Sequence, residues 1–104
     1  MSKIIDEPVD ISNLYYIELF DLSDVEVRHH FYCQNNSLTN LIGAPHTVGG
    51  SFYCNNNPLN SLEGIPKTIG GNFCIPKELM SMFTAYQIRN LSNIMGEITY
   101  CIFT

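Results

Sequence analysis

Apolar and polar positions in the middle of the chain recur with a fixed 21-residue period. The segment FYCQNNSLTNLIGAPHTVGGS begins at Phe31, and FYCNNNPLNSLEGIPKTIGGN begins at Phe52. The two segments are identical at 12 of 21 positions, and an apolar residue stays apolar where Val48 is replaced by Ile69. A fixed period of this length is the signature of a repeat architecture, in which successive units stack to bury one continuous core.

The start of each unit alternates apolar and polar residues, as a half-buried β-strand does. Phe52 and Cys54 lie two positions apart, so their side chains point to the same side of a strand. We expect them to face the core, as Phe31 and Cys33 do in the first unit. Tyr53, between them, is then expected to point outward.

Asparagine, glycine and proline occupy fixed places later in the unit. The amides of Asn36 and Asn57 can both donate to and accept from the backbone of the turn that follows the strand, so stacked units predict an asparagine ladder. Glycine pairs at 49–50 and 70–71 are expected to supply the φ > 0 needed to turn into the next strand. Pro45 and Pro66 favour an extended, non-helical return.

Read as L-x-L-x-x-N-x-L-x-x-L, the second unit places Phe52, Cys54, Asn57, Leu59 and Leu62 in the motif positions. Here the chain resembles the leucine-rich-repeat family. The closer resemblance is to small repeat proteins of tailed phages and some bacteria, with units like NxLTSLEGxPxxVGGxFxC. The resemblance covers residues 27–75. It implies a short solenoid with a small parallel sheet that serves recognition. Phe and Cys replace Leu in the strand, and two full repeats are few for a horseshoe.

The repeat fades towards both ends of the chain. Upstream, Val27 falls in the column of Val48, while Ile17 and Phe20 fall in the two leucine columns; downstream, Phe73 is in the phenylalanine column. We therefore expect an α+β single domain over 1–104, with an N-terminal cap at 1–26, leucine-rich repeats at 27–75 and a C-terminal cap at 76–104.

The two caps differ in how clearly the sequence describes them. Pro76 suits the first turn of a helix, and an apolar stripe predicts a capping helix from Pro76 to Met95; the stripe comprises Leu79, Met80, Phe83, Tyr86, Leu91 and Ile94. A short final strand is expected at Ile98–Phe103. The segment Ile11–Phe20 reads equally as helix or strand, and we expect only a capping element there.

Charge narrows the classes of partner. The net charge is −5, and the five basic residues are spread along the chain. Nonspecific binding of DNA or RNA needs clustered Lys and Arg, so we do not expect it here. Seven of the ten acidic residues lie in residues 1–26. Such a segment is either a solvated cap or a docking surface for a basic partner, which would mainly raise the association rate.

The N-terminus shows no signal-peptide pattern, and no apolar run approaches the ~20 residues that span a bilayer. We expect no membrane association and a cytoplasmic protein (host cytoplasm if viral). The four cysteines are accordingly expected to be reduced thiols. Cys74 falls in the outward column of Tyr53 and is the one expected to be exposed.

The sequence offers no candidate catalytic or metal site. No two of the four cysteines lie close together in the sequence, whereas zinc binding uses close pairs. His29, His30 and His46 lack convergent carboxylates or thiolates in the pattern and are expected at the surface or rim. No catalytic motif is present. We therefore expect no enzyme activity and no cofactor.

The remaining candidates are the outward positions of the strands, a surface of tyrosine and amide side chains suited to protein interfaces. Tyrosine is also simply a good strand former. The expected partner-binding residues are His30, Tyr32, Gln34, Asn35, Ser51, Tyr53, Asn55, Asn56, Asn72 and Cys74.

These observations and the resemblance favour a non-enzymatic protein-binding module, a phage accessory protein that binds and inhibits a host defence protein. Two alternatives stay open. Open sheet edges would suit a self-assembling structural protein, that is, a homo-oligomer. The acidic N-terminal part would suit a decoy of a nucleic-acid-binding site, whose partner binding would weaken steeply with salt.

Overall fold

The computed structural model describes residues 3–100, which form two parallel sheets and one α-helix, a mixed α/β arrangement. The odd-strand sheet contains β1 (Lys3–Ile5), β3 (Val25–Val27), β5 (Thr47–Val48), β7 (Thr68–Ile69) and β9 (Asn93–Ile94). The even-strand sheet contains β2 (Val9–Asp10), β4 (Phe31–Tyr32), β6 (Phe52–Tyr53), β8 (Phe73–Cys74) and β10 (Ile98–Thr99).

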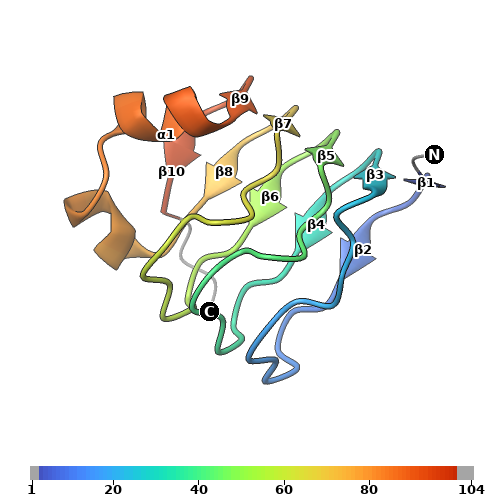
Figure 1. Ribbon diagram of the computed structural model, residues 1–104, viewed down its shortest axis with the longest axis horizontal. Coiled ribbons are helices and arrows are strands. Elements are labelled where there is room, and N and C mark those ends of the chain that lie inside the picture. The colour runs from blue at the N-terminus through green and yellow to red at the C-terminus, as the bar shows by residue number, and fades with distance from the viewer. Residues whose placement is uncertain (1–2, 101–104) are drawn as a thin grey trace.

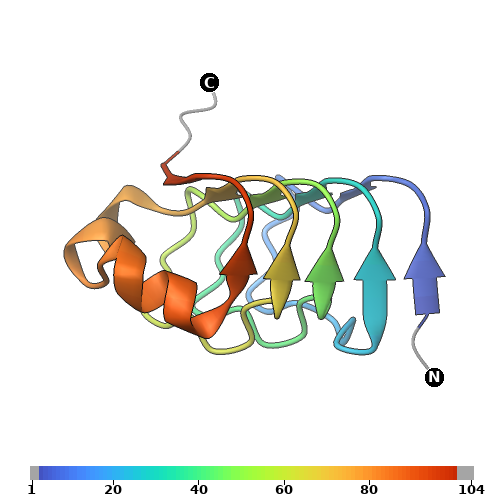
Figure 2. The same cartoon turned by 90° about the horizontal axis from the view of Figure 1, so that it is seen from above.

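The chain alternates between the two sheets and advances by one strand in each sheet with every winding (Figure 1). All the pairings are parallel, and in the middle of the chain each strand pairs with the equivalent strand of the next unit, as Phe31 does with Phe52 and Phe52 with Phe73. Seen from above, the windings follow one another in a row, with α1 (Ala85–Leu91) at the C-terminal end (Figure 2). Identical positions of the repeat units therefore become neighbours across each sheet.

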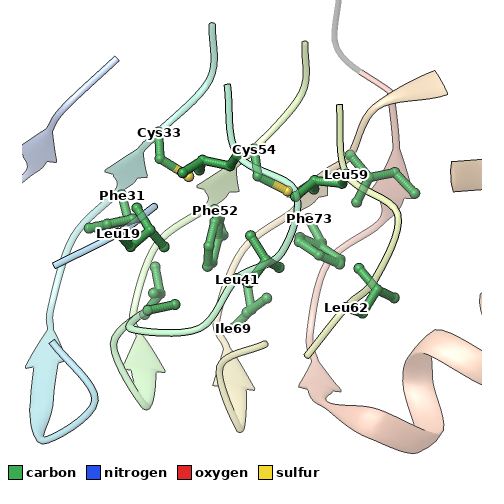
Figure 3. Close-up of a cluster of buried hydrophobic side chains, with 14 of the residues drawn as sticks. Leu19, Phe31, Cys33, Leu41, Phe52, Cys54, Leu59, Leu62, Ile69 and Phe73 are labelled. Carbon is green, nitrogen blue, oxygen red and sulfur yellow. The ribbon is translucent and has the colours of Figure 1, made fainter. Parts of the chain in front are cut away.

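The core lies between the two sheets and follows the apolar columns of the sequence. Phe31, Phe52 and Phe73 are fully buried and touch edge to face, with ring centroids 5.3 and 5.7 Å apart. Figure 3 shows these rings in a row, with Cys33 and Cys54 beside them. The expected inward orientation of phenylalanine and cysteine is confirmed.

The predicted asparagine ladder is confirmed. Asn57 Oδ1 accepts from the backbone N–H groups of Asn36 and Leu38, both at 3.1 Å. Its Nδ2 donates to the carbonyls of Cys33 and Cys54 at 3.0 and 3.1 Å. Asn36 repeats the pattern one winding earlier. Each amide thus ties one winding to the preceding one at the turn.

The expectation of a single sheet is wrong, because the return segments form a sheet of their own. Thr47–Val48 and Thr68–Ile69 pair in register as β5 and β7. Val48 and Ile69 are fully buried while both threonines are partly exposed. Two residues per unit are too short a run for alternation to be recognised in the sequence, yet parallel pairing with neighbours on both sides satisfies their backbone groups.

The glycine pairs do not supply positive φ, contrary to expectation. The glycines with positive φ are Gly43 at 99° and Gly64 at 90°. Gly49 and Gly70 are needed for another reason: a methyl group at Gly70 would overlap the carbonyl of Gly49, and one at Gly49 would overlap the carbonyl of Arg28. The backbones of successive windings approach too closely there for any side chain.

The N-terminal segment is a further winding that contributes β1 and β2 as edge strands. Val9 pairs with Phe31, whereas the repeat period would pair Asp10 with it, so this winding is one residue longer than the repeat. The leucine columns consequently fall on Tyr16 and Leu19, which pack on or in the core, and not on Ile17 and Phe20, which are 75% and 49% exposed. The segment 11–20 contains neither helix nor strand.

The helix predicted from Pro76 to Met95 is confirmed only in part, because the α-helix is limited to Ala85–Leu91. A 3₁₀ segment, η1 (Lys77–Ser81), is followed by the short helix α1, which begins at a capping box formed by Thr84 and Gln87. From the stripe, Leu79 is buried but Met80, Tyr86 and Leu91 are exposed. The helix ends because Asn93–Ile94 joins the odd-strand sheet beside β7 as β9. Of the predicted final strand at Ile98–Phe103, Ile98–Thr99 is confirmed, and 101–103 lie outside the described residues.

Among the residues that the structure describes, no helix has the length and apolar character to cross a membrane.

Candidate partner-binding face

The candidate face is the outer side of the even-strand sheet, opposite the core. Because Phe31 and Cys33 point inward and are fully buried, the alternating residues His30, Tyr32 and Gln34 lie on the outer side of the sheet. The same holds one winding later for Ser51, Tyr53 and Asn55, and then for Asn72 and Cys74. The structure therefore brings eight of the ten predicted residues onto one face.

The centre of the face is an aromatic cluster. Tyr32 and Tyr53 are register partners, and their rings are stacked nearly parallel, with centroids 4.9 Å apart and an interplanar angle of 5°. The His30 ring meets both rings edge-on at 5.9 and 6.0 Å. Both tyrosines are half-buried and His30 is exposed. The pairing of neighbouring strands brings these three rings together in one group.

A second row of hydrogen bonds, which the sequence analysis missed, runs beside the aromatic cluster. His30 Nδ1 accepts from the backbone N–H of Ser51 at 2.8 Å, and Ser51 Oγ accepts from the N–H of Asn72 at 3.0 Å. Asn72 Oδ1 in turn accepts from the N–H of Glu97 at 2.9 Å. Ser51 is buried. His30, Ser51 and Asn72 thus have the same structural role, since each accepts a hydrogen bond from the backbone of the next winding. Because the residue type differs at the three positions, comparison of the repeat units does not identify them as equivalent.

Two amide side chains of the face are buried although they lie on its outer side. Gln34 is 8% exposed and Asn55 is 2% exposed. Gln34 Oε1 and Asn55 Oδ1 accept no hydrogen bond from the residues that the structure describes. Buried polar atoms are nearly always paired in native proteins, so these two oxygens are unusual. They were expected to be accessible contact residues, and the structure corrects that.

Cys74 is not the exposed thiol that its column predicted. It pairs with Tyr53, as expected, but it is 1% exposed and its sulfur is disulfide-bonded. The expectation that all four cysteines are reduced is therefore wrong. Position on the outer side of a sheet does not by itself decide exposure, because other parts of the chain can cover that side.

Asn35 and Asn56 lie in the turns that follow β4 and β6. Both have left-handed backbone conformations, with φ of 59° and 56°, which asparagine tolerates better than most residues. Asn56 Nδ2 donates to Asn35 Oδ1. They line an open groove of about 930 Å³ that Tyr15 and Glu78 also line. These two predicted residues thus lie at the rim of the face.

The histidines do not converge on a metal site. His29 Nε2 lies 3.0 Å from Asp6 Oδ1, and His46 Nδ1 lies 2.8 Å from Thr47 Oγ1. Within residues 3–100 no group of three His, Cys, Asp or Glu side chains is placed to hold a metal ion.

The free cysteines, Cys33 and Cys54, are packed as small apolar side chains in the core. Burial, reinforced for Cys33 by the neighbouring Cys54, raises the thiol pKa of Cys33 well above its usual range. Burial likewise raises the pKa of Cys54. Both side chains therefore stay protonated at neutral pH, whereas a nucleophilic cysteine needs a lowered pKa.

Asp10 is a residue of the face that the sequence analysis overlooked. It is the register partner of Tyr32 on the edge strand β2 and is exposed. Its Oδ1 accepts from the backbone N–H and the hydroxyl of Ser12 at 2.9 and 2.6 Å. The repeat period would have placed Ile11 opposite Tyr32, and only the extra residue in the first winding brings Asp10 there.

Known proteins give no further guide to this face: no model of a known protein family, no curated protein and no solved structure matches the chain.

Proposed function

We propose that this chain is a short leucine-rich-repeat solenoid that works as a non-enzymatic protein-binding module through the outer side of its even-strand sheet. The observation that carries the proposal is the stacked pair Tyr32–Tyr53 with the His30 ring against both. Aromatic side chains held rigid by a sheet supply large contact area with little loss of side-chain entropy on binding. Clustered tyrosines are also typical of interface hot spots.

The resemblance to phage repeat proteins supports the biological half of the proposal. On that basis we propose a phage accessory protein that binds and inhibits a host defence protein in the host cytoplasm. This step rests on similarity of the repeat motif, which by itself does not fix a function.

Affinity capture from a bacterial host lysate tests the proposed face. The variant Tyr32→Ala/Tyr53→Ala should lose a stoichiometric partner protein that the unmodified chain retains. The matched control is Thr47→Ala/Thr68→Ala, which changes the corresponding register pair on the outer side of the odd-strand sheet and should retain the partner. Thermal unfolding of all three chains excludes loss of binding through loss of fold.

A photo-crosslinking residue gives a second readout of the same prediction. Asn72, which immediately precedes β8, and Asn93, in β9 of the odd-strand sheet, are both exposed. A benzophenone side chain at position 72 should crosslink to the captured protein, and one at position 93 should not. Capture that is equal for both double variants, or crosslinking from position 93 alone, would refute the assigned face.

A second candidate function, self-assembly, is favoured by the N-terminal winding. The edge strands β1 and β2 end the two sheets there, and such edges can pair with another chain. Large apolar side chains of this winding are exposed: Ile4, Leu14, Tyr15, Ile17 and Phe20.

Light scattering at micromolar concentration distinguishes self-assembly from partner binding. If the N-terminal winding joins copies, the measured mass should be a multiple of 11.8 kDa. The variant Ile17→Ser/Phe20→Ser should then return the mass to that of one chain, while Met80→Ser/Met82→Ser, which changes two exposed residues near the C-terminal end, should not. A single-chain mass for the unmodified protein would count against this candidate.

A further inference from the structure

Two buried amide oxygens on the face could each accept a hydrogen bond from a ligand. Gln34 Oε1 and Asn55 Oδ1 are buried and accept no bond from the described residues. Gln34 and Asn55 occupy equivalent positions of neighbouring windings, since the backbone bonds Cys33 N–H to Tyr53 O and Asn35 N–H to Asn55 O set the register around them. A buried acceptor without a partner costs free energy. A ligand that supplies N–H groups here would remove that cost.

On the same face as these oxygens, Tyr32 of the stacked pair lies between Tyr53 on β6 and the edge strand β2. Tyr53 covers one side of the Tyr32 ring at a centroid distance of 4.9 Å. The other side of Tyr32 faces the neighbouring strand, where the register places Asp10. No basic side chain in residues 3–100 forms an ion pair with Asp10. The Tyr32 ring and a carboxylate without an ion pair in residues 3–100 therefore lie in register on neighbouring strands.

The net charge of the N-terminal segment, which includes Asp10, favours a positively charged ligand. Residues 1–26 hold seven of the ten acidic residues and one of the five basic residues. A cation approaching Tyr32 is therefore attracted by the aromatic ring, by the neighbouring Asp10 carboxylate and by the net negative charge of this segment.

We propose that the face binds an arginine-bearing segment of a protein partner, with the guanidinium stacked on Tyr32 beside Asp10. The N–H groups of that segment then bond to Gln34 Oε1 and Asn55 Oδ1. Arginine fits better than lysine because its planar guanidinium stacks on an aromatic ring and offers five N–H donors. This inference rests on the proposed function, since it names the chemistry of the protein that the same face would bind.

The two oxygens are buried in the unbound chain, so a ligand can reach them only after a local rearrangement. Part of the binding free energy is spent on that rearrangement. A free peptide should therefore bind weakly, with a dissociation constant on the order of 1 mM. Exchange at such affinity is well suited to nuclear magnetic resonance titration.

The experiment titrates the ¹⁵N-labelled chain with the blocked peptide acetyl-Gly-Arg-Gly-amide. Resonances of the Gln34 and Asn55 side-chain amides and of the β4 and β6 backbone should shift in a saturable manner. The probe is compared with its lysine version, which keeps the charge, and its citrulline version, which keeps the planar shape and loses the charge. Both should bind more weakly than the arginine peptide, by about threefold to tenfold.

Paired variants connect the titration to the proposed contacts. Asp10→Asn, which keeps an acceptor for Ser12, and Tyr32→Leu should each weaken arginine-peptide binding by about threefold to tenfold. Asp24→Asn removes the same charge from another exposed position, and Tyr86→Leu removes a tyrosine that is 72% exposed on α1. Both controls should bind as the unmodified chain does.

Equal binding of the citrulline peptide, shifts that map elsewhere, or no saturable shift would overturn the arginine inference. If protein crosslinks still form from position 72 in that case, the proposed face stands and only its chemistry is different. Shifts at Gln34 and Asn55 that vanish in Asp10→Asn and Tyr32→Leu would support the inference independently of any lysate partner.

Discussion

Replacing Asn57 by alanine is expected to lower the free energy of unfolding by about 4 kcal/mol. The Asn57 amide is buried and accepts from the N–H groups of Asn36 and Leu38. It also donates to the carbonyls of Cys33 and Cys54. Each buried backbone group left without a partner costs ~1–3 kcal/mol. The loss is large against the ~5–15 kcal/mol by which a typical domain is stable.

Urea unfolding measures this loss, and the neighbouring asparagine is its control. Asn56 is exposed and has a φ of 56°, a conformation that glycine adopts freely. Asn56→Gly should therefore change the free energy of unfolding by less than about 1 kcal/mol. Similar losses in the free energy of unfolding for Asn56→Gly and Asn57→Ala would mean that the asparagine ladder does not hold successive windings together.

Replacing Phe52 by alanine is expected to cost about 4 kcal/mol, within the range for large cavities in a core. Phe52 is fully buried at the centre of the aromatic row and touches both Phe31 and Phe73. Its removal leaves a cavity between two windings and deprives both neighbours of an edge-to-face contact. Windings in such a stack contact mainly their neighbours, so a central defect weakens the contacts on both sides.

Tyr53, the neighbour of Phe52 on β6, serves as the control, because it lies on the same strand but is less buried. Tyr53 is half-buried on the opposite side of β6, so Tyr53→Ala should cost markedly less, about 1 kcal/mol. Both variants are compared by urea unfolding monitored by circular dichroism. Equal losses would contradict the placement of the core between the two sheets.

The constant period of the repeat was sufficient to predict the inner side of the even-strand sheet and its ladder. Identical residues in consecutive units meet in a parallel stack, because parallel register brings equal positions together. For that reason the phenylalanine, tyrosine and asparagine columns that start at Phe31, Tyr32 and Asn36 could be placed from the sequence alone. The aromatic centre of the candidate face follows from the same columns, and the stacking angle does not.

Tertiary structure decided the features that depend on contacts between non-identical segments. The two-residue strands at Thr47 and Thr68 exist because neighbouring windings on both sides pair with them. The apolar residues from Leu79 to Ile94 fit a long helix, yet α1 ends at Leu91 because Ile94 pairs into the odd-strand sheet. Pairing and burial across the stack outweigh local helical propensity there.

The chemistry of the face was likewise only partly visible in the sequence. The repeat determined by itself which residues point inward, which point outward and which asparagines cap the turns, because these follow from local alternation and from one constant period. Only the folded chain decided that Asp10 lies beside Tyr32, that Gln34 and Asn55 are buried, and that Cys74 is covered. One extra residue in the first winding shifts its register, and burial depends on segments that are distant in sequence.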